Sequence, residues 1–369
     1  MKTLGGTLMK TLGSLLAAFI FQGCYTVKQG YHQVRILARA KSIDSVLAQD
    51  SESPERQRKL KLVPEVMKFA QEQLALAPGS LYKKYVALDG NAVTWIVQAA
   101  ERRSLRQKTW WFPLVGAQPY LGYFVRQDAQ NFKRELDNEG WDTSISGVQA
   151  FSMLGYFPDP VYSSMLDGND EAELAEVLIH EATHATIYVP GFSEFNENLA
   201  SFFGFYGALQ FLRSRSDLGF DVRSVEQKHS RNNEARKKFG EYLQLARIRL
   251  EAFYQKALVQ PELSAEAAFL DARQRIFDDL ASDYVSFMGS LELGSSYEGA
   301  FARGRFNNAV FLGYSLYDAK QEPFARLLRR VDGNLALFIR AIRECVSTKP
   351  ETEEELWQRI ELCEGENKR

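Results

Sequence analysis

The stretch from Glu171 to Ser201, EAELAEVLIHEATHATIYVPGFSEFNENLAS, contains two helical patterns separated by a turn. Apolar residues recur at helical spacing up to Tyr188, and the Pro190-Gly191 pair then interrupts the pattern. Ser193 is a suitable N-cap residue for a second helix. The stretch therefore predicts two antiparallel helices joined by a short turn, and our interpretation of the fold rests on this arrangement.

Two of the four histidines of the chain lie four residues apart on the first predicted helix. Residues at this spacing share a helix face, so His180 and His184 can bind one tetrahedral Zn²⁺ ion. Zinc lowers the pKa of a bound water toward about 7, and a nearby carboxylate can take its remaining proton and return it to a leaving amine. Glu181 is placed for that role. The pattern indicates a zinc-dependent peptidase; the alternative is a pair of polar residues on a buried helix.

A catalytic zinc site uses three protein ligands and keeps one position open. The second predicted helix offers Glu197, four residues after the Ser193 cap, whereas the first helix should end about four residues after His184. In an antiparallel hairpin these two residues lie at similar heights above the turn. Glu194 lies closer to the turn, where an acidic residue favours a helix N-terminus. We therefore predict Glu197 as the third ligand; an ordinary exposed carboxylate is the alternative.

Helical patterns also dominate most of the remaining sequence. Periodicity and breakers predict helices over residues 171–188, 194–214, 224–258, 264–288, 299–317, 321–346 and 351–362. Residues 29–50 and 55–76 predict an N-terminal helical hairpin. Between this hairpin and the helices from residue 171 on, residues 78–160 contain short aromatic and β-branched runs, such as Val93–Val97 and Thr109–Phe112, that predict a small sheet.

The expected fold class is mainly α with a small β subdomain, α+β. We expect a signal peptide over residues 1–23 and one metallopeptidase unit over 24–369. Within that unit, residues 24–77 form the N-terminal helical hairpin, 78–160 a small mixed β region and 161–369 a helical catalytic region.

The first residues have the pattern of an export signal. Lys2 and Lys10 precede an apolar run over residues 12–21, and Gly23-Cys24 follows directly. This ending resembles a bacterial lipobox, in which the cysteine is acylated and becomes the new N-terminus. Met1 to Gly5 recurs as Met9 to Gly13, which leaves the true start codon, Met1 or Met9, open. An ordinary signal peptide with an incidental Cys24 is the alternative.

Export and acylation predict a protein of the cell envelope, anchored by lipid and facing the periplasm. Tyr25 follows the cysteine where an inner-membrane retention signal would have aspartate, so the outer membrane is favoured. Acylation of Cys24 leaves Cys345 and Cys363, either as a disulfide or as two free thiols. A balance of 45 basic against 47 acidic residues provides no basic field for nucleic acid, which is not an expected partner.

Further motifs occur in order along the chain: PYLGYF from Pro119, GWD from Gly140, AFSMLGYFPDP from Ala150, Asn196-Glu197, and Asn307-Asn308-Ala309. With the histidine motif, they make the chain resemble the bacterial predicted zinc aminopeptidases, envelope proteins of the gluzincin type. This resemblance spans nearly the whole mature chain. It implies a zincin-like fold, zinc, a downstream glutamate ligand and peptide substrates.

The chain departs from the family pattern at Leu121, where a basic residue is expected, and at Phe151, Met153 and Tyr156, where the family has Tyr, Thr and Trp. These departures concern substrate preference more than the metal site. Aminopeptidase specificity follows from the resemblance alone, because the chain has no Gly-x-Met-Glu-Asn segment for binding a free amine. An endopeptidase or a cell-wall amidase therefore stays open.

Two assignments concern substrate contacts. Tyr314 or Tyr317, after Asn307-Asn308-Ala309, offers support for a developing oxyanion; core packing is the alternative. Residues 146–154 offer a strand edge for an extended peptide, or form a plain strand. The rival from another class is a non-catalytic envelope lipoprotein, in which the same residues hold a structural zinc or none and the helices form a binding or assembly module.

Overall fold

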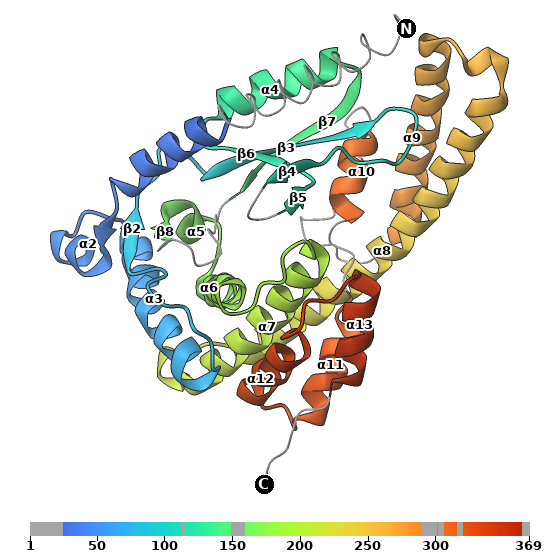
Figure 1. Ribbon diagram of the computed structural model, residues 1–369. Helices are drawn as coiled ribbons and strands as arrows, with labels where there is room; N and C mark the ends of the chain where they lie inside the picture. Colours follow the sequence, from blue (N-terminus) through green and yellow to red (C-terminus); the bar gives the residue numbers. More distant parts are fainter. Residues whose placement is uncertain are drawn as a thin grey trace, which may run out of the picture.

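A computed structural model describes residues 25–112, 116–148, 159–289, 301, 306–315 and 320–363. These residues form a mainly helical protein with small sheets, which confirms the expected fold class (Figure 1). The predicted signal peptide, Cys24, Tyr317 and residues 149–158 lie outside the described ranges. No helix within those ranges is both long and apolar enough to span a bilayer.

The strands are β1 (Lys41–Ser42), β2 (Lys84–Val86), β3 (Thr94–Glu101), β4 (Trp110–Phe112), β5 (Gly116–Gln118), β6 (Leu121–Tyr123), β7 (Trp141–Val148) and β8 (Val161–Tyr162). The helices are an N-terminal helix of residues 25–37, α2 (Ile43–Gln49), α3 (Pro54–Gln73), α4 (Arg126–Asn138), α5 (Ser163–Asp167), α6 (Glu171–Thr186), α7 (Ser193–Ser214), α8 (Val222–Val259), α9 (Glu266–Met288), α10 (Asn308–Ser315), α11 (Glu322–Arg330), α12 (Leu335–Cys345) and α13 (Glu353–Leu362).

One sheet lies between two helices. Its order is β6-β3-β7, and β3 pairs antiparallel with both neighbours. Successive strand residues point to opposite faces, so Val97 and Ala99 pack with α4, whereas Gln98 and Ala100 face α10. The sheet is therefore covered on both faces, by α4 on one and α10 on the other (Figure 1). A second sheet has the order β1-β2-β8, and β4 pairs with β5.

The α6–α7 hairpin is packed into the largest hydrophobic cluster, which it shares with α3 and the C-terminal helices. A capping box starts α6, because Asp170 accepts from the backbone N–H of Glu173 and Glu173 accepts from that of Asp170. The turn is closed by Asn196, whose side-chain amide accepts from the N–H of Val189 and donates to its carbonyl, both at 2.9 Å. Asn196 thus fixes where α7 begins relative to α6.

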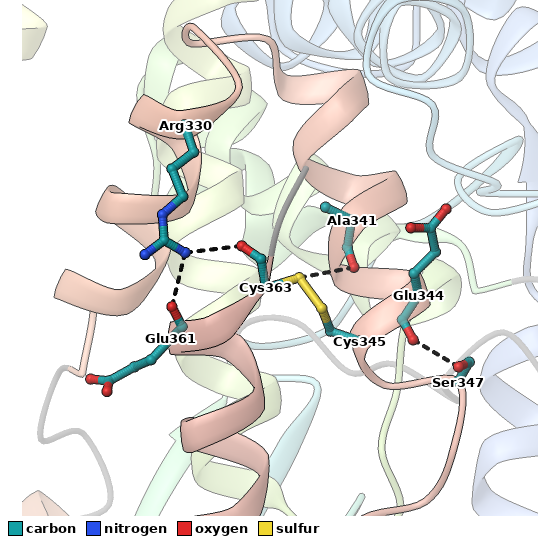
Figure 2. The surroundings of a disulfide bond; sticks show 7 residues. All are labelled: Arg330, Ala341, Glu344, Cys345, Ser347, Glu361 and Cys363. Atoms are coloured by element: carbon teal, nitrogen blue, oxygen red, sulfur yellow. Dashed lines mark hydrogen bonds between the residues drawn. A yellow bond between two sulfur atoms is a disulfide. The ribbon is translucent and has the colours of Figure 1, made fainter. Parts of the chain in front are cut away.

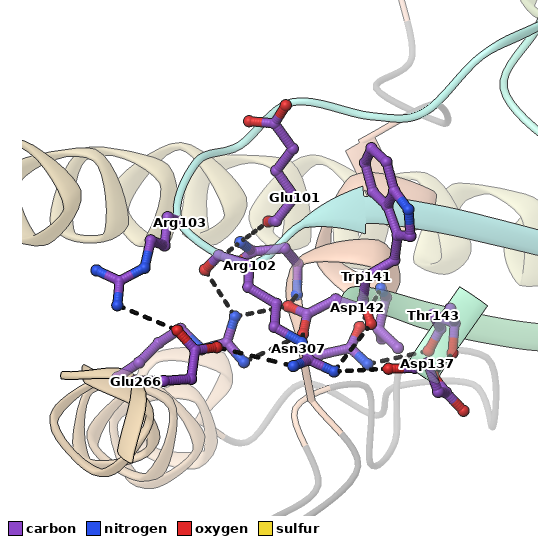
Figure 3. Close-up of polar contacts among 12 residues, drawn as sticks. Glu101, Arg102, Arg103, Asp137, Trp141, Asp142, Thr143, Glu266 and Asn307 are labelled. Atoms are coloured by element: carbon purple, nitrogen blue, oxygen red, sulfur yellow. Dashed lines mark hydrogen bonds and ion pairs between the residues drawn. The ribbon is translucent and has the colours of Figure 1, made fainter. Parts of the chain in front are cut away.

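Helices α8 and α9 form a long antiparallel pair at one side of the molecule, with a hydrophobic cluster of their own that includes α10 (Figure 1). A buried polar network joins this pair to the sheet. Arg273 of α9 donates to both carboxylate oxygens of Asp142 on β7, at 2.7 and 3.1 Å, and to the carbonyl of Arg102. Figure 3 shows the contacts around Asp142.

The C-terminal helices α11, α12 and α13 pack against α7 through aromatic side chains. Rings of Phe195 and Phe202 pack against Phe324 of α11, and Phe195 also contacts Trp357 of α13. A disulfide joins Cys345, at the end of α12, to Cys363 (Figure 2). Beside it, the Arg330 guanidinium donates to the carbonyls of Glu361 and Cys363 at 2.8 and 3.0 Å (Figure 2).

Several predicted boundaries differ from the structure. The helix expected over residues 29–50 is divided by a two-residue strand, β1. The one over 321–346 is interrupted between α11 and α12, where Asp332 and Gly333 have φ of +53° and +76°. The one over 299–317 is not helical at residues 301, 306 and 307, and α10 begins at Asn308. Helix α4 falls in the region predicted as sheet. Its buried Ala129, Phe132 and Leu136 do have helical spacing, but the aromatic and β-branched runs around it dominated the pattern.

Candidate metal centre

Three side chains of the α6–α7 hairpin converge. Their ligand atoms, Nε2 of His180, Nε2 of His184 and the carboxylate of Glu197, all lie within 4.8 Å of one another. The two imidazole nitrogens are 3.1 Å apart, and the Glu197 oxygens lie 3.6 Å from His180 and 3.5 Å from His184. These groups are close enough to bind one metal ion. Glu194 is not among them, because its carboxylate pairs with Lys320 at 2.9 Å.

The three side chains differ in exposure to solvent, which increases from His184 through His180 to Glu197. The His184 side chain is 6% exposed, His180 is 21% exposed and Glu197 is 47% exposed. Burial lowers the pKa of His184 to about 4, with a smaller contribution from the neighbouring His180. His184 is therefore neutral at pH 7, which is the form that binds metals.

His180 and Glu197 influence each other. Burial lowers the pKa of His180, but the hydrogen bond to Glu197 and the negative charges of Glu181, Glu197 and Glu176 outweigh burial and raise that pKa above its ordinary value. Burial raises the pKa of Glu197, but the hydrogen bond from His180 and the charges of both imidazoles bring it below its ordinary value. The pair thus favours an ionised Glu197 carboxylate.

Glu181 follows His180 on α6 and is half-buried. Sequence reasoning missed one residue in its electrostatic surroundings, Tyr82. Burial raises the pKa of the Tyr82 phenol well above its ordinary value, and the charge of Glu181 adds to this shift, followed by that of Asp159. The backbone of Tyr82 is left-handed, with φ of +58°, and its N–H donates to the Asp159 carbonyl at 2.8 Å. Such strain is found often at functional sites.

Close helix packing brings the ligands together. At Gly204 of α7, a Cβ atom would lie 3.0 Å from the carbonyl oxygen of Glu176 and 3.2 Å from the Cβ of His180. The two helices therefore approach closely at this glycine, directly beside His180, and a side chain at position 204 would have to push its neighbours aside. The other histidine of the group, His184, is buried, and its Nδ1 has no hydrogen-bond partner among the residues that the structure describes.

The two predicted tyrosines and the predicted strand edge are not shown to contact the three ligands. Tyr314 belongs to the second hydrophobic cluster, where its ring is 5.3 Å from that of Phe239, and burial raises the pKa of its phenol. Tyr317 is outside the described part of the chain. Of the predicted strand edge, residues 146–148 belong to β7, an outer strand of its sheet, and residues 149–154 are not described.

Comparison with known proteins identifies one family. The family model Aminopep, described as "Putative aminopeptidase", matches residues 24–357. The match includes the sheet, the hairpin with its three converging ligands and the long helical pair. No curated protein and no solved structure matches the chain significantly.

Proposed function

The chain belongs to the Aminopep family, and on that premise we propose that it is a zinc-dependent peptidase in which His180, His184 and Glu197 hold the metal and Glu181 is the general base. The observation that carries the proposal is the convergence of two imidazole nitrogens and a carboxylate from two helices. A cluster of electron-pair donors that face one another is stable only around a cation or a shared proton.

The spacing of the three groups supports zinc. Ligand atoms about 2.0–2.1 Å from a tetrahedral zinc ion lie roughly 3.4 Å from one another. The observed separations of 3.1, 3.5 and 3.6 Å surround this value. Imidazole nitrogens with one carboxylate are a common zinc donor set, and three protein ligands are typical of catalytic sites, whereas structural sites are usually closed by four. The group within the described residues has three members.

Each residue then has a defined part in peptide hydrolysis. Zinc, when bound, supplies a positive charge that acidifies water and polarises a carbonyl. Glu181 accepts a proton from the attacking water and returns it to the nitrogen of the leaving amine. His180 and His184 hold their Nε2 atoms toward the metal because both project from one face of α6. Glu197 adds a negative charge on the more exposed side.

The family description supports an aminopeptidase, and we propose peptides with a free α-amine as substrates. An endopeptidase or a cell-wall amidase would cleave peptides whose amine is blocked. The non-catalytic alternative, a lipoprotein that serves as a binding or assembly module, would cleave neither. Comparing free and acetylated versions of the same peptide separates these three functions.

Metal content and hydrolysis measured on the same samples test the proposal. The chain from residue 24 on is purified beside His180→Ala, Glu197→Ala and a control, Glu194→Ala, which alters a carboxylate one helical turn away. We expect one zinc per chain and hydrolysis of free-amine peptides, both lost in the first two variants and retained in the control. Zinc without hydrolysis of any peptide, or no zinc in the unaltered chain, would refute the proposed enzyme.

We also propose that the protein is anchored in the cell envelope through an acylated Cys24 and faces the periplasm, with the outer membrane favoured. The sequence supports this, because a basic and apolar leader ends in Gly23-Cys24. Metabolic labelling with a fatty acid should mark the unaltered protein and not Cys24→Ser. Equal labelling of both would exclude Cys24 as the acylated residue.

A further inference from the structure

The N-terminal helix, residues 25–37, is held to the protein by one face. The Tyr25 hydroxyl donates to the Gly122 carbonyl on β6 at 2.6 Å, and Gln29 accepts from the backbone N–H of Phe124 at 3.2 Å. Gln29, one turn after Tyr25, is buried, and Ile36, three turns after Tyr25, packs against the largest hydrophobic cluster. The helix therefore has a fixed orientation at the outer rim of the molecule, beside α4 (Figure 1).

The opposite face of this helix presents large apolar side chains to solvent. Val27 is 74% exposed, Tyr31 60% and Val34 65%. Their spacing of four and three residues places them in one stripe along the helix. Single exposed apolar residues need no explanation, but an aligned group on a well-anchored helix is typical of an interaction surface.

The charged residues of the helix and of the segment that follows it are all basic. Residues 25–43 contain four basic residues, Lys28, Arg35, Arg39 and Lys41, and no acidic residue. Two of the four have partners from other elements: Lys28 pairs with Asp128 at 2.9 Å and Arg39 with Asp89 at 3.0 Å. Arg35 lies over the Tyr31 ring, 5.8 Å from its centroid. An apolar stripe flanked by basic residues fits the boundary between anionic headgroups and acyl chains.

We propose that the N-terminal helix lies on an anionic phospholipid membrane, with Val27, Tyr31 and Val34 inserted among the lipids and Arg35 and Lys41 near the phosphates. Its position selects a membrane over a protein partner, because the stripe begins three residues after Cys24, the residue proposed to carry the lipid. A basic and apolar helix surface next to the lipid would add to the attachment that the acylated Cys24 provides. This inference does not depend on the peptidase activity.

A helix fixed to the protein on one face and to the membrane on the other does more than add affinity. A flexible linker after an acylated residue would let the enzyme adopt any orientation. Here the hydrogen bonds of Tyr25 to β6 and of Gln29 to Phe124, directly after β6, fix the helix relative to the sheet. The metal centre is therefore held at a set orientation relative to the bilayer.

The test uses the chain from residue 24 on with Cys24→Ser, which contains every described residue and cannot be acylated. Co-sedimentation is measured with vesicles of phosphatidylglycerol and phosphatidylethanolamine, and with vesicles of phosphatidylcholine alone. We expect binding to the anionic vesicles only. A variant with Val27, Tyr31 and Val34 all changed to Ser should bind about tenfold more weakly, because the buried apolar area drives insertion. Arg35→Glu with Lys41→Glu should weaken binding by roughly fivefold per basic residue removed.

A control variant, Leu258→Ser with Val259→Ser, removes two equally exposed apolar residues from the end of α8 and should bind as the parent does. Zinc content and peptide hydrolysis should be unchanged in all these variants, so that failure of the membrane proposal is separate from failure of the enzyme proposal. Equal vesicle binding by the stripe variant and its parent would overturn the inference. So would a parent that ignores anionic vesicles and forms dimers that the stripe variant does not, because the stripe would then bind a second copy.

Discussion

Two polar clusters in this protein differ in how their atoms are paired. Around Asp142, both carboxylate oxygens accept hydrogen bonds, Oδ1 from Arg273 and Oδ2 from both Arg273 and the backbone N–H of Asn308. The Asn308 side chain donates to the Glu101 carbonyl at 2.8 Å and accepts from the Tyr254 hydroxyl at 2.6 Å. Donors and acceptors match throughout this network, so it needs no further group.

The α6–α7 hairpin has the opposite character. Two imidazole nitrogens and a carboxylate converge there within 4.8 Å of one another, and Nδ1 of His184 has no hydrogen-bond partner among the described residues. Buried polar atoms are normally paired, so the unpaired Nδ1 of the buried His184 points to a ligand or a function of this hairpin. The comparison teaches that polarity and burial alone do not identify a functional site. The matched network stabilises the fold, and the unmatched hairpin is suited to hold a cation.

Replacing the proposed base should have the largest effect, and only on chemistry. Glu181→Gln preserves the shape of the side chain but removes its ability to take a proton. We expect kcat for a free-amine peptide to fall by about 10²–10⁴-fold with zinc content unchanged, as for loss of a general base. The matched control is Glu171→Gln at the start of α6, which should keep full activity. Full activity in Glu181→Gln would sink the mechanism and leave the metal site untouched.

Breaking the matched network should have a comparable effect in kcal/mol, but on stability. Arg273→Met removes both hydrogen bonds to Asp142 and leaves a buried carboxylate without its closest cation. Arg102, whose Nε lies 3.8 Å from Oδ1, stays as a more distant cation, so the loss in the free energy of unfolding should lie toward the lower end of the about 3–5 kcal/mol found when one partner of a buried ion pair is removed. Urea titration followed by circular dichroism measures this loss.

At temperatures where Arg273→Met is still folded, zinc per chain and kcat should equal those of the parent. The control Arg249→Ala removes an exposed partner of Asp283 on the same pair of helices and should change stability little, because surface ion pairs contribute about 0–1 kcal/mol. Loss of zinc from folded Arg273→Met would show that the two clusters are coupled, contrary to the comparison.

The sequence predicted the hairpin well because its signals are local. The breaker Pro190-Gly191 placed the start of α7 within one residue, although Ser193, predicted as the N-cap, is the first helical residue and Phe192 is at the cap position. Counting from the turn favoured Glu197 over Glu194, and it is Glu197 that lies with the two histidines. The role of Asn196 was not anticipated, since an amide that closes a turn has no spacing signature. Zinc, acylation and the roles of Tyr314 and Tyr317 stay predictions.

The network around Asp142 could not be predicted in the same way. Arg273 lies 131 residues from Asp142 along the chain, and Asn308 lies 166 residues from it. The motifs that contain Asp142 and Asn308, GWD and Asn307-Asn308-Ala309, were recognised by resemblance to the family. Periodicity, however, does not predict which distant segments contact one another. Tyr82 was missed for a related reason, because only tertiary packing holds its backbone at φ of +58° next to the Asp159 carbonyl. Long-range contacts decide such positions.

The smallest expected effect tests whether the geometry of the hairpin, and not its donor set alone, makes the metal site. Gly204→Ala adds a methyl group 3.0 Å from the Glu176 carbonyl and 3.2 Å from the Cβ of His180, so α7 must move away from α6 and carry Glu197 with it. Overpacking of this kind costs about 1–3 kcal/mol. We expect zinc affinity, measured by competition with a chelator, to fall by roughly tenfold, which is 1.4 kcal/mol.

Gly30→Ala is the matched control, because Gly30 is also a helical glycine but a Cβ atom there meets nothing within 4 Å. The contrary result is a Gly204→Ala protein that is less stable but binds zinc as tightly as the control. The Glu197 side chain would then adjust its rotamer to reach the metal, and the packing of the two helices would not set the affinity.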